Sequence, residues 1–370
     1  MSTVKGYIYP PLMAWLLQPL TLLPIAIAHR CWQAFTFLLT TSSMWVGYRT
    51  IARYFAWPHD WRTTLTVMLA ALILSAGEAK TEWSSAQCDS LVLDAFCFSL
   101  ALLHSQPVLA GLIIAFGINI KYQTLLLLPY LLWRRHFKVA GAAISGTVLW
   151  GLLPMLGLGW AATKEAWAGA LGGMGKFIGL RVPGSAEIHD LTWDHSISVT
   201  SAFGRGLSYF QLSPSLAFTL GAVIVAAGII LLNEAYRAAR LPLIGQLSPP
   251  PHQSARLLII EWCIILVTLL TFGPQTTRRH LFLLLFFHLA IASLLLLPGL
   301  SRPGKKRLLI ALIVSQLALR LPPSASWCQI ASDAWKWIGG PSWGILFLLV
   351  VLIQTTLAHL PASDAQAKRS

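Results

Sequence analysis

Charged side chains are scarce in this chain: Asp, Glu, Lys and Arg make up 11% of its 370 residues, whereas hydrophobic residues make up 56%. No polar stretch is long enough to enclose a hydrophobic core of its own, which excludes a soluble domain of ordinary size. Apolar blocks close to the length of a bilayer span recur from one end of the chain to the other. The sequence therefore predicts an all-α, polytopic integral membrane protein.

Acidic residues are the rarer charge, with 13 Asp and Glu against 27 Lys and Arg, so the formal net charge is +14. In a soluble protein this excess would point to nucleic acid. Here the basic residues cluster in short segments between apolar blocks, where membrane topology explains them better. We therefore expect the lipid bilayer, and no nucleic acid, as a partner.

Cysteine is also sparse, and its five copies show neither the paired spacing of a zinc site nor a disulfide framework. We interpret them as small buried hydrophobes. A glycine-rich phosphate loop and a nucleophile elbow are absent as well. The glycines of residues 172–175 lack the strand-to-helix context of a nucleotide site. The sequence predicts no metal and no cofactor.

The apolar blocks predict about eleven transmembrane helices in one membrane domain, residues 1–361, with a disordered cytoplasmic tail at 362–370. Residues 1–23 form a proline-framed elbow segment, and 161–200 a long extracytoplasmic loop. The blocks at 108–120 and 122–133 are too short to cross the bilayer comfortably, which predicts tilted or broken helices, tolerated where they line a cavity. The eleven blocks are 24–48, 63–77, 87–104, 108–120, 122–133, 139–160, 214–232, 257–271, 280–297, 308–319 and 341–360.

Five basic clusters fix the predicted orientation. Placing them all in the cytoplasm is compatible with strict alternation of the eleven blocks, and that side then holds 15 of the 27 basic residues. Most polar residues outside these clusters then fall on the extracytoplasmic side. Such one-sided convergence favours a site at the outer interface over a channel. The clusters are Arg49/Arg53/Arg62, Arg134/Arg135/Lys138, Arg237/Arg240/Arg256, Arg302/Lys305/Lys306/Arg307 and Lys368/Arg369.

Lys121 interrupts an uncharged run from Phe96 to Trp133, with Asn119 and Gln123 beside it. A charge among apolar residues is costly without a partner or water and usually marks a functional site. One interpretation is a lysine that snorkels to the interface from a helix end. The other is a cation that neutralises a lipid phosphate.

A second group of polar residues on the predicted extracytoplasmic side consists of Gln87 and Asp89. Asp94 follows them, and Glu78 and Glu82 precede them. A carboxylate at a helix start can simply cap that helix. Asp89 is alternatively an acceptor for sugar hydroxyls or a general base.

Two further groups lie on the predicted outer side. The loop from Arg181 to Ser196 mixes acids, histidines and tryptophan before Arg205, and loops of this length are more often functional than idle. The cluster at 276–280 carries Arg278 and Arg279 against the positive-inside trend, which indicates an anionic partner. Whether this anionic partner is a bilayer phosphate or a substrate phosphate remains open.

In their order along the chain, these segments resemble glycosyltransferase family 87, polyprenol-phosphate-mannose-dependent membrane enzymes of the GT-C superfamily. The resemblance extends from Tyr9 to about Leu297, and its closest match is the segment around Lys121. The resembling segments are residues 9–12, 18–24, 86–89, 109–112, 119–129 with 133–135, 194–205, and 273–274 with 279–280.

The departures from the family pattern concern the predicted chemistry. The family implies a catalytic aspartate in the first extracytoplasmic loop, after a first helix, and neither has a counterpart before Tyr9. A start codon placed too late, a truncated chain and a lost transfer activity remain open as explanations. Ala86 replaces the family's usual glycine, and Asp194 with His195 replaces asparagine–glutamine.

The resemblance and the residues together predict a membrane glycosyltransferase that takes a hexose, mannose in this interpretation, from a polyprenyl phosphate. The acceptor hydroxyl belongs to a glycan or glycolipid at the extracytoplasmic face of the plasma membrane. The rival hypothesis is an inactive binding protein or transporter for lipid-linked sugars. The predicted site residues are Asp89, Asp194 and His280 for catalysis, Lys121, Arg205 and Arg279 for phosphate, and Tyr9, Gln87, Asn119 and His195 for sugar or acceptor contacts.

Overall fold

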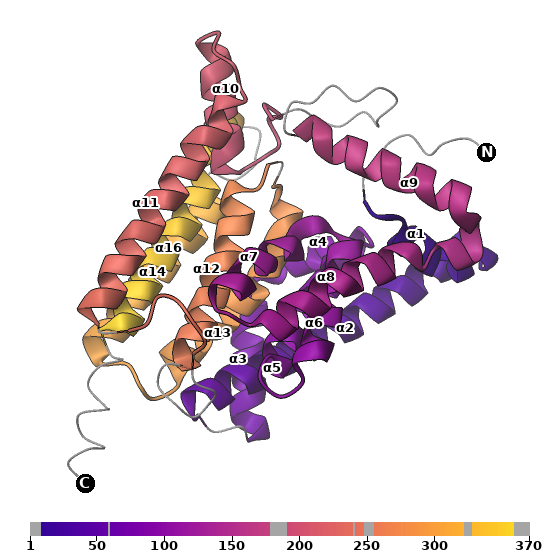
Figure 1. The fold of residues 1–370 in the computed structure, drawn as a ribbon. Helices are drawn as coiled ribbons and strands as arrows, with labels where there is room; N and C mark the ends of the chain where they lie inside the picture. Colours follow the sequence, from indigo (N-terminus) through magenta and orange to yellow (C-terminus); the bar gives the residue numbers. More distant parts are fainter. Residues whose placement is uncertain are drawn as a thin grey trace. The chain divides into compact units, whose positions relative to one another are not determined.

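The computed structural model describes residues 9–57, 60–177, 191–239, 241–247, 255–274, 276–321 and 328–358. The regular secondary structure of these residues is helical, with no strand, which confirms the predicted all-α polytopic membrane protein (Figure 1). The chain forms two compact units. Unit 1 comprises Met1–Val46 and Ala79–Asp190, and unit 2 comprises Gly47–Glu78 and Leu191–Ser370.

Unit 1 is built from short helices around α6. Gly111 of α6 lies so close to α8 that a Cβ there would fall 2.4 Å from the Val139 carbonyl, so only glycine permits this backbone contact. Helix α5 packs on α6, and α1 packs on α9. The elements are α1 (Pro11–Leu16), η1 (Gln18–Leu22), the first part of α2 (Ile25–Phe55), most of α4 (Ala76–Ser84), α5 (Asp89–Leu102), α6 (Pro107–Ile120), η2 (Tyr122–Leu126), α7 (Leu127–Trp133), α8 (Phe137–Leu152) and α9 (Met155–Phe177).

Unit 2 places α14 beside α16 and α13 beside α3. Side-chain caps begin three of its helices: Asp60 accepts from Thr63 N–H, Ser198 from Ser201 N–H and Ser301 from Gly304 N–H. The elements are α3 (Trp61–Leu74), α10 (Val199–Tyr209), α11 (Leu216–Ala238), α12 (Arg256–Phe272), η4 (Arg278–Leu284), α13 (Leu285–Leu296), α14 (Arg302–Arg320), α15 (Gln329–Trp337) and α16 (Gly340–Leu357).

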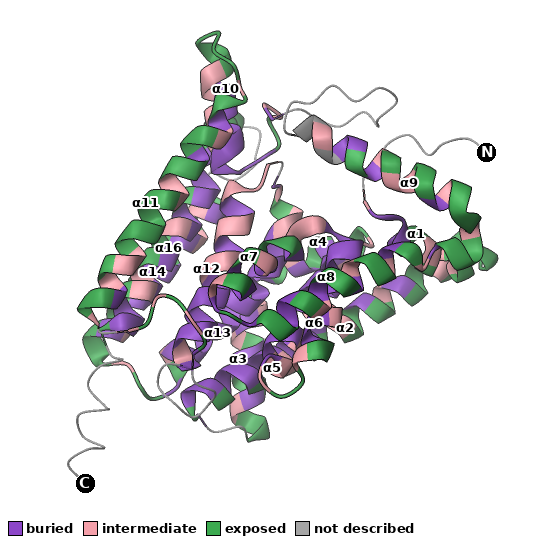
Figure 2. Cartoon of the chain, viewed as in Figure 1, coloured by how far each residue is buried: buried purple, intermediate pink, exposed green. Residues whose placement is uncertain are grey.

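Three helical segments of the described residues are long and apolar enough to cross a membrane, namely Leu216–Ala238, Arg278–Leu296 and Gly340–Leu357. Two bent helix pairs raise this number to five if each pair counts as one span, and in one of them the bend between α8 and α9 is 95°. Helix α11 exposes a long apolar face, as a bilayer-facing helix does (Figure 2). The number of eleven spans stays a prediction, because several apolar blocks are divided into shorter helices.

The broken helix predicted around Lys121 is confirmed, whereas the loop predicted at 161–200 is wrong over its first part. Lys121 ends α6 in an extended conformation (φ −146°, ψ 141°), and η2 follows. Helix α9 continues to Phe177, with a kink at Gly159 (φ 78°). The alanines of this stretch favour helix, although it also contains Lys164 and Glu165. The predicted loop residues 178–190 and the tail 362–370 lie outside the described residues.

Candidate functional site

Lys121 forms a buried ion pair with Asp89. The distance from Lys121 Nζ to Asp89 Oδ1 is 2.6 Å, and the two side chains are 2% and 0% exposed. The extended backbone at the end of α6 carries the lysine, and the first residue of α5 carries the carboxylate. A snorkelling lysine would reach water, so this burial excludes that interpretation. Charges buried so completely are tolerated only when they are paired.

Glu82 takes the capping role that sequence reasoning allowed for Asp89. Its Oε1 accepts a hydrogen bond of 2.9 Å from the backbone N–H of Ser90, in the first turn of α5. Cys88, at the N-cap position of this helix, makes no side-chain cap. Glu82 Oε2 has no hydrogen-bond partner among the described residues, although the side chain is fully buried. The carboxylate also interacts electrostatically with Asp89 and Lys121.

Tyr9 completes the group around the ammonium ion. Lys121 Nζ lies 5.4 Å from the centre of the Tyr9 ring, within the range of a cation–π contact. Sequence reasoning missed Glu82 as a member of this group. The sequence did contain a signal for it: an acid, Glu82, lies shortly before the start of α5, and the N-cap residue of that helix has no side chain that caps it. We call Tyr9, Glu82, Asp89 and Lys121 the Lys121 cluster, and all four belong to unit 1.

The turn before α5 gives a conformational reason for the glycine that the resemblance implies where the chain has Ala86. Ala86 adopts a left-handed conformation with φ 50°, which L-residues with a Cβ rarely adopt. The Trp32 indole N–H donates to the carbonyls of Ala86 (2.9 Å) and Gln87 (3.1 Å) and holds the turn in place. The Gln87 amide donates to the Ser85 carbonyl at 3.3 Å.

Replacing Ala86 with glycine is expected to raise the free energy of unfolding by about 1 kcal/mol, because glycine adopts positive φ without steric cost. Thermal unfolding of the purified protein measures this change. The matched control is Ala142→Gly inside α8, where glycine is expected to lower stability by about 1 kcal/mol. A destabilised Ala86→Gly variant would contradict the strained turn.

Asn119 joins α6 to α8. Its Nδ2 donates to the carbonyls of Ala115 (2.9 Å) and Thr147 (3.1 Å), and the side chain is fully buried. Its Oδ1 has no hydrogen-bond partner among the described residues. Both donors of Asn119 are thus engaged inside the protein, which leaves the carbonyl oxygen for any sugar contact.

Arg205 is fully engaged by backbone carbonyls. Its guanidinium donates to Trp193 (2.8 Å) and Ser196 (3.0 Å) through Nη1, to Lys336 (3.0 Å) and Trp337 (2.7 Å) through Nη2, and to Trp337 (3.0 Å) through Nε. An arginine has five N–H donors, and all five are used here. Two of the carbonyls end α15, where a cation also meets the helix dipole. Arg205 therefore connects the segment that contains Trp193 and Ser196 to the end of α15. In this arrangement it has no N–H left to donate to a phosphate.

Asp194 and His195 lie at the surface of unit 2. Asp194 Oδ1 is 2.6 Å from His195 Nδ1, and the two side chains are 76% and 73% exposed. The hydrogen bond from His195 holds the pKa of the Asp194 carboxyl below its ordinary value. The charged form of Asp194 is thus favoured, and its side chain is exposed.

Arg279 and His280 lie in η4, the short helix that leads directly into α13. The Thr277 backbone N–H donates to His280 Nδ1 at 3.0 Å, which assigns the proton of a neutral ring to Nε2. Arg279 Nε is buried and has no hydrogen-bond partner among the described residues. The backbone N–H of Ile197 donates to the Thr276 carbonyl at 2.8 Å. This bond brings the loop at 194–198 to the predicted cluster at 276–280.

The predicted site residues thus divide between the two units. Asp89, Lys121 and Tyr9 come together in the Lys121 cluster, and Gln87 and Asn119 belong to the same unit. Asp194, His195, Arg205, Arg279 and His280 belong to unit 2. No three His, Cys, Asp or Glu side chains among the described residues are grouped as metal ligands.

The helical architecture and the buried charged cluster define a polytopic membrane protein with an ionic site inside its apolar interior. The sequence model of glycosyltransferase family 87 matches residues 7–247, which is more than half of the chain and includes the whole Lys121 cluster. The chain belongs to glycosyltransferase family 87 and is a membrane glycosyltransferase. Neither a curated protein nor a solved structure matches it.

Proposed function

We propose that this glycosyltransferase transfers a hexose, mannose by its family resemblance, from a polyprenyl phosphate to a hydroxyl of a glycan or glycolipid. The reaction takes place at the extracytoplasmic face of the plasma membrane. The bond between the sugar C1 and the phosphate oxygen breaks, and a bond from C1 to the acceptor oxygen forms. The acceptor proton passes to a base, and the polyprenyl phosphate departs as an anion.

The observation that carries this proposal is the buried ammonium of Lys121. In the proposed reaction, its positive charge stabilises the charge that develops on the departing phosphate. Asp89 is a positioning residue in this scheme, because its Oδ1 already holds the ammonium at 2.6 Å. The buried site supports such a role, since water does not screen charges there.

Glu82 is the carboxylate that we propose as the general base. It lies in the same unit as the ammonium, and its Oε2 has no hydrogen-bond partner among the described residues. Asp94, by contrast, is held by Ser42 Oγ (2.8 Å) and Ser43 Oγ (2.6 Å). Asp194 and His280 remain candidates from unit 2. Arg279, with its unpartnered Nε, is a second candidate for the phosphate.

The rival function is a binding protein or transporter that retains the lipid-linked sugar without transferring it. Transporters of lipid-linked sugars are expected to carry internal repeats and polar residues near the midplane. The sequence has no convincing repeat, which disfavours transport. An inactive binding protein would bind the donor and release no polyprenyl phosphate.

Glu82→Gln is expected to lower sugar transfer about 10²–10⁴-fold, the range for removal of a general base. Glutamine keeps an oxygen that accepts from the Ser90 N–H, so folding is retained. The assay supplies polyprenyl-phosphate-mannose to proteoliposomes of the full chain and measures mannose transfer and polyprenyl phosphate release. The matched control is Asp94→Asn, which neutralises another acid of unit 1 and is expected to leave transfer unchanged. Full transfer by Glu82→Gln would exclude Glu82 as the base.

A further inference from the structure

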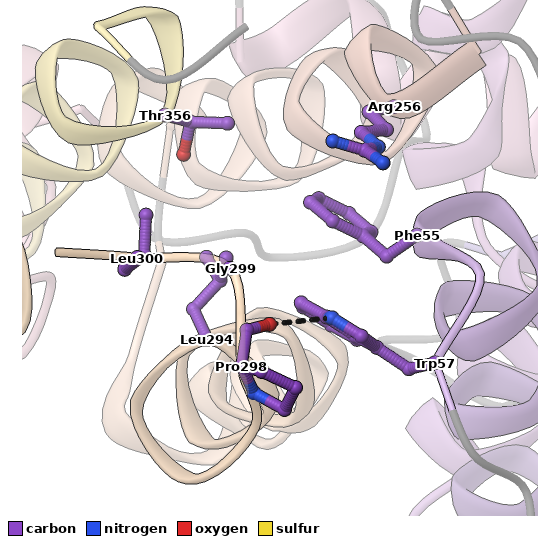
Figure 3. A pocket seen from close by; sticks show the side chains of 8 residues that line it. All are labelled: Phe55, Trp57, Arg256, Leu294, Pro298, Gly299, Leu300 and Thr356. Carbon is purple, nitrogen blue, oxygen red and sulfur yellow. Dashed lines mark hydrogen bonds between the residues drawn. The ribbon is translucent and has the colours of Figure 1, made fainter. Parts of the chain in front are cut away.

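Unit 2 contains a cavity of about 220 Å³ that the proposed transfer chemistry does not use. The end of α2 supplies Phe55, and Trp57 follows it. The start of α12 supplies Arg256, and α16 supplies Thr356 (Figure 3). The rest of the wall comes from the end of α13 and the corner that follows it, namely Leu294, Pro298, Gly299 and Leu300.

The corner between α13 and α14 is held in shape by specific contacts. The Trp57 indole N–H donates to the Pro298 carbonyl at 2.7 Å, and Lys305 Nζ donates to the Leu297 carbonyl at 2.8 Å. Gly299 has φ 129°, a conformation that favours glycine. Specific hydrogen bonds and a glycine conformation therefore define this part of the cavity wall.

Two polar groups face the cavity. The guanidinium of Arg256 lies 5.6 Å from the centre of the Phe55 ring, which itself stacks on Trp57 with centroids 4.3 Å apart. Thr356 Oγ1 has no hydrogen-bond partner among the described residues, and the residue is only 3% exposed. Figure 3 shows this hydroxyl directed into the space that the guanidinium also faces. An unpartnered buried hydroxyl is costly, so such groups usually have a ligand or another function.

The lining residues have the chemistry of a phosphate site with an apolar wall. None of the described residues that line the cavity is acidic, and Arg256 is the basic residue among them. Arginine pairs with phosphate through parallel N–H bonds, and the Thr356 hydroxyl adds a further donor. Leu294, Leu300 and the aromatic pair supply the apolar surface.

We infer that this cavity binds the phosphate headgroup of an anionic membrane lipid. A lipid fits better than a free anion because the cavity adjoins the end of an apolar candidate span, Arg278–Leu296, and combines a cation with apolar walls. An exposed basic residue also lies close by in sequence, namely Arg53, two residues before Phe55. Basic residues at a membrane surface attract anionic lipids. The inference does not rest on the proposed transfer reaction.

Native mass spectrometry of the full chain tests the site with three probes: phosphatidylglycerol, phosphatidylcholine and inorganic phosphate. Wild-type protein is expected to retain phosphatidylglycerol. Thr356→Val is expected to weaken this retention about threefold to tenfold, and Arg256→Gln at least about tenfold, as the loss of neutral and charged hydrogen bonds predicts. The matched control Arg302→Gln removes an exposed nearby charge and is expected to change retention less than about twofold.

Thr356→Val also separates a ligand role from a structural one. Valine has nearly the same shape and removes a hydroxyl that has no hydrogen-bond partner among the described residues, so thermal stability is expected to be equal or higher. Weakened lipid retention in this folded variant supports the site. Unchanged retention in Thr356→Val, equal retention of phosphatidylcholine, or displacement of the lipid by inorganic phosphate would each overturn it.

Discussion

Lys121→Met is expected to destabilise the protein by about 3–5 kcal/mol and to abolish sugar transfer. The substitution leaves the Asp89 carboxylate buried and without the ammonium that holds it at 2.6 Å. Most of the stability loss therefore comes from the remaining uncompensated charge. Thermal unfolding and the proteoliposome transfer assay measure the two effects separately.

The double variant Asp89→Leu with Lys121→Met distinguishes folding from chemistry. Replacing both members of a buried ion pair with apolar residues of similar volume is often neutral, or stabilising by about 1–4 kcal/mol. The double variant is therefore expected to unfold near the wild-type temperature and to remain inactive. A pair with a purely structural function would instead regain transfer together with stability.

The second large effect is expected at Arg205. Arg205→Gln removes the donors of four backbone carbonyls at once and is expected to lower the free energy of unfolding by about 3–5 kcal/mol. Arg205→Lys should be only partly better, because an ammonium has three donors and no planar fork. Thermal unfolding of both variants checks this order.

The transfer rate of Arg205→Lys per folded molecule is expected to stay close to that of the wild type. Arg279→Gln is the matched control, because it removes an arginine of the same unit whose Nε has no hydrogen-bond partner among the described residues. If Arg279 binds the phosphate, this control lowers transfer and leaves stability nearly unchanged. A stable but inactive Arg205→Lys variant would contradict the structural function of Arg205 and restore its predicted phosphate role.

The sequence was sufficient to predict the helical membrane class, because hydropathy alone reports which segments avoid water. It also indicated the break in the helix at Lys121, where a charge and an amide interrupt an apolar run. The partner of Lys121 was not predictable, since Asp89 lies 32 residues earlier and only the packing of α5 on α6 brings them together.

Arg205 and α9 show what residue type alone does not predict. A buried arginine that binds carbonyls and one that binds a phosphate look the same in a sequence, because the difference lies in the surrounding backbone. Helix α9 carries Lys164 and Glu165 among its alanines and extends into the region where a loop was predicted. Glu82 was noticed only as a neighbour of Asp89, because its cap on α5 depends on a turn that positive φ at Ala86 produces.

In the proposed reaction, the ammonium of Lys121 acts on the departing phosphate. The most direct measurement compares mannose transfer from polyprenyl-phosphate-mannose by wild-type protein and by the Asp89→Leu, Lys121→Met double variant, in proteoliposomes matched for folded protein. We expect transfer by the wild type and none by the folded double variant. Equal transfer by the two proteins would contradict this role of Lys121.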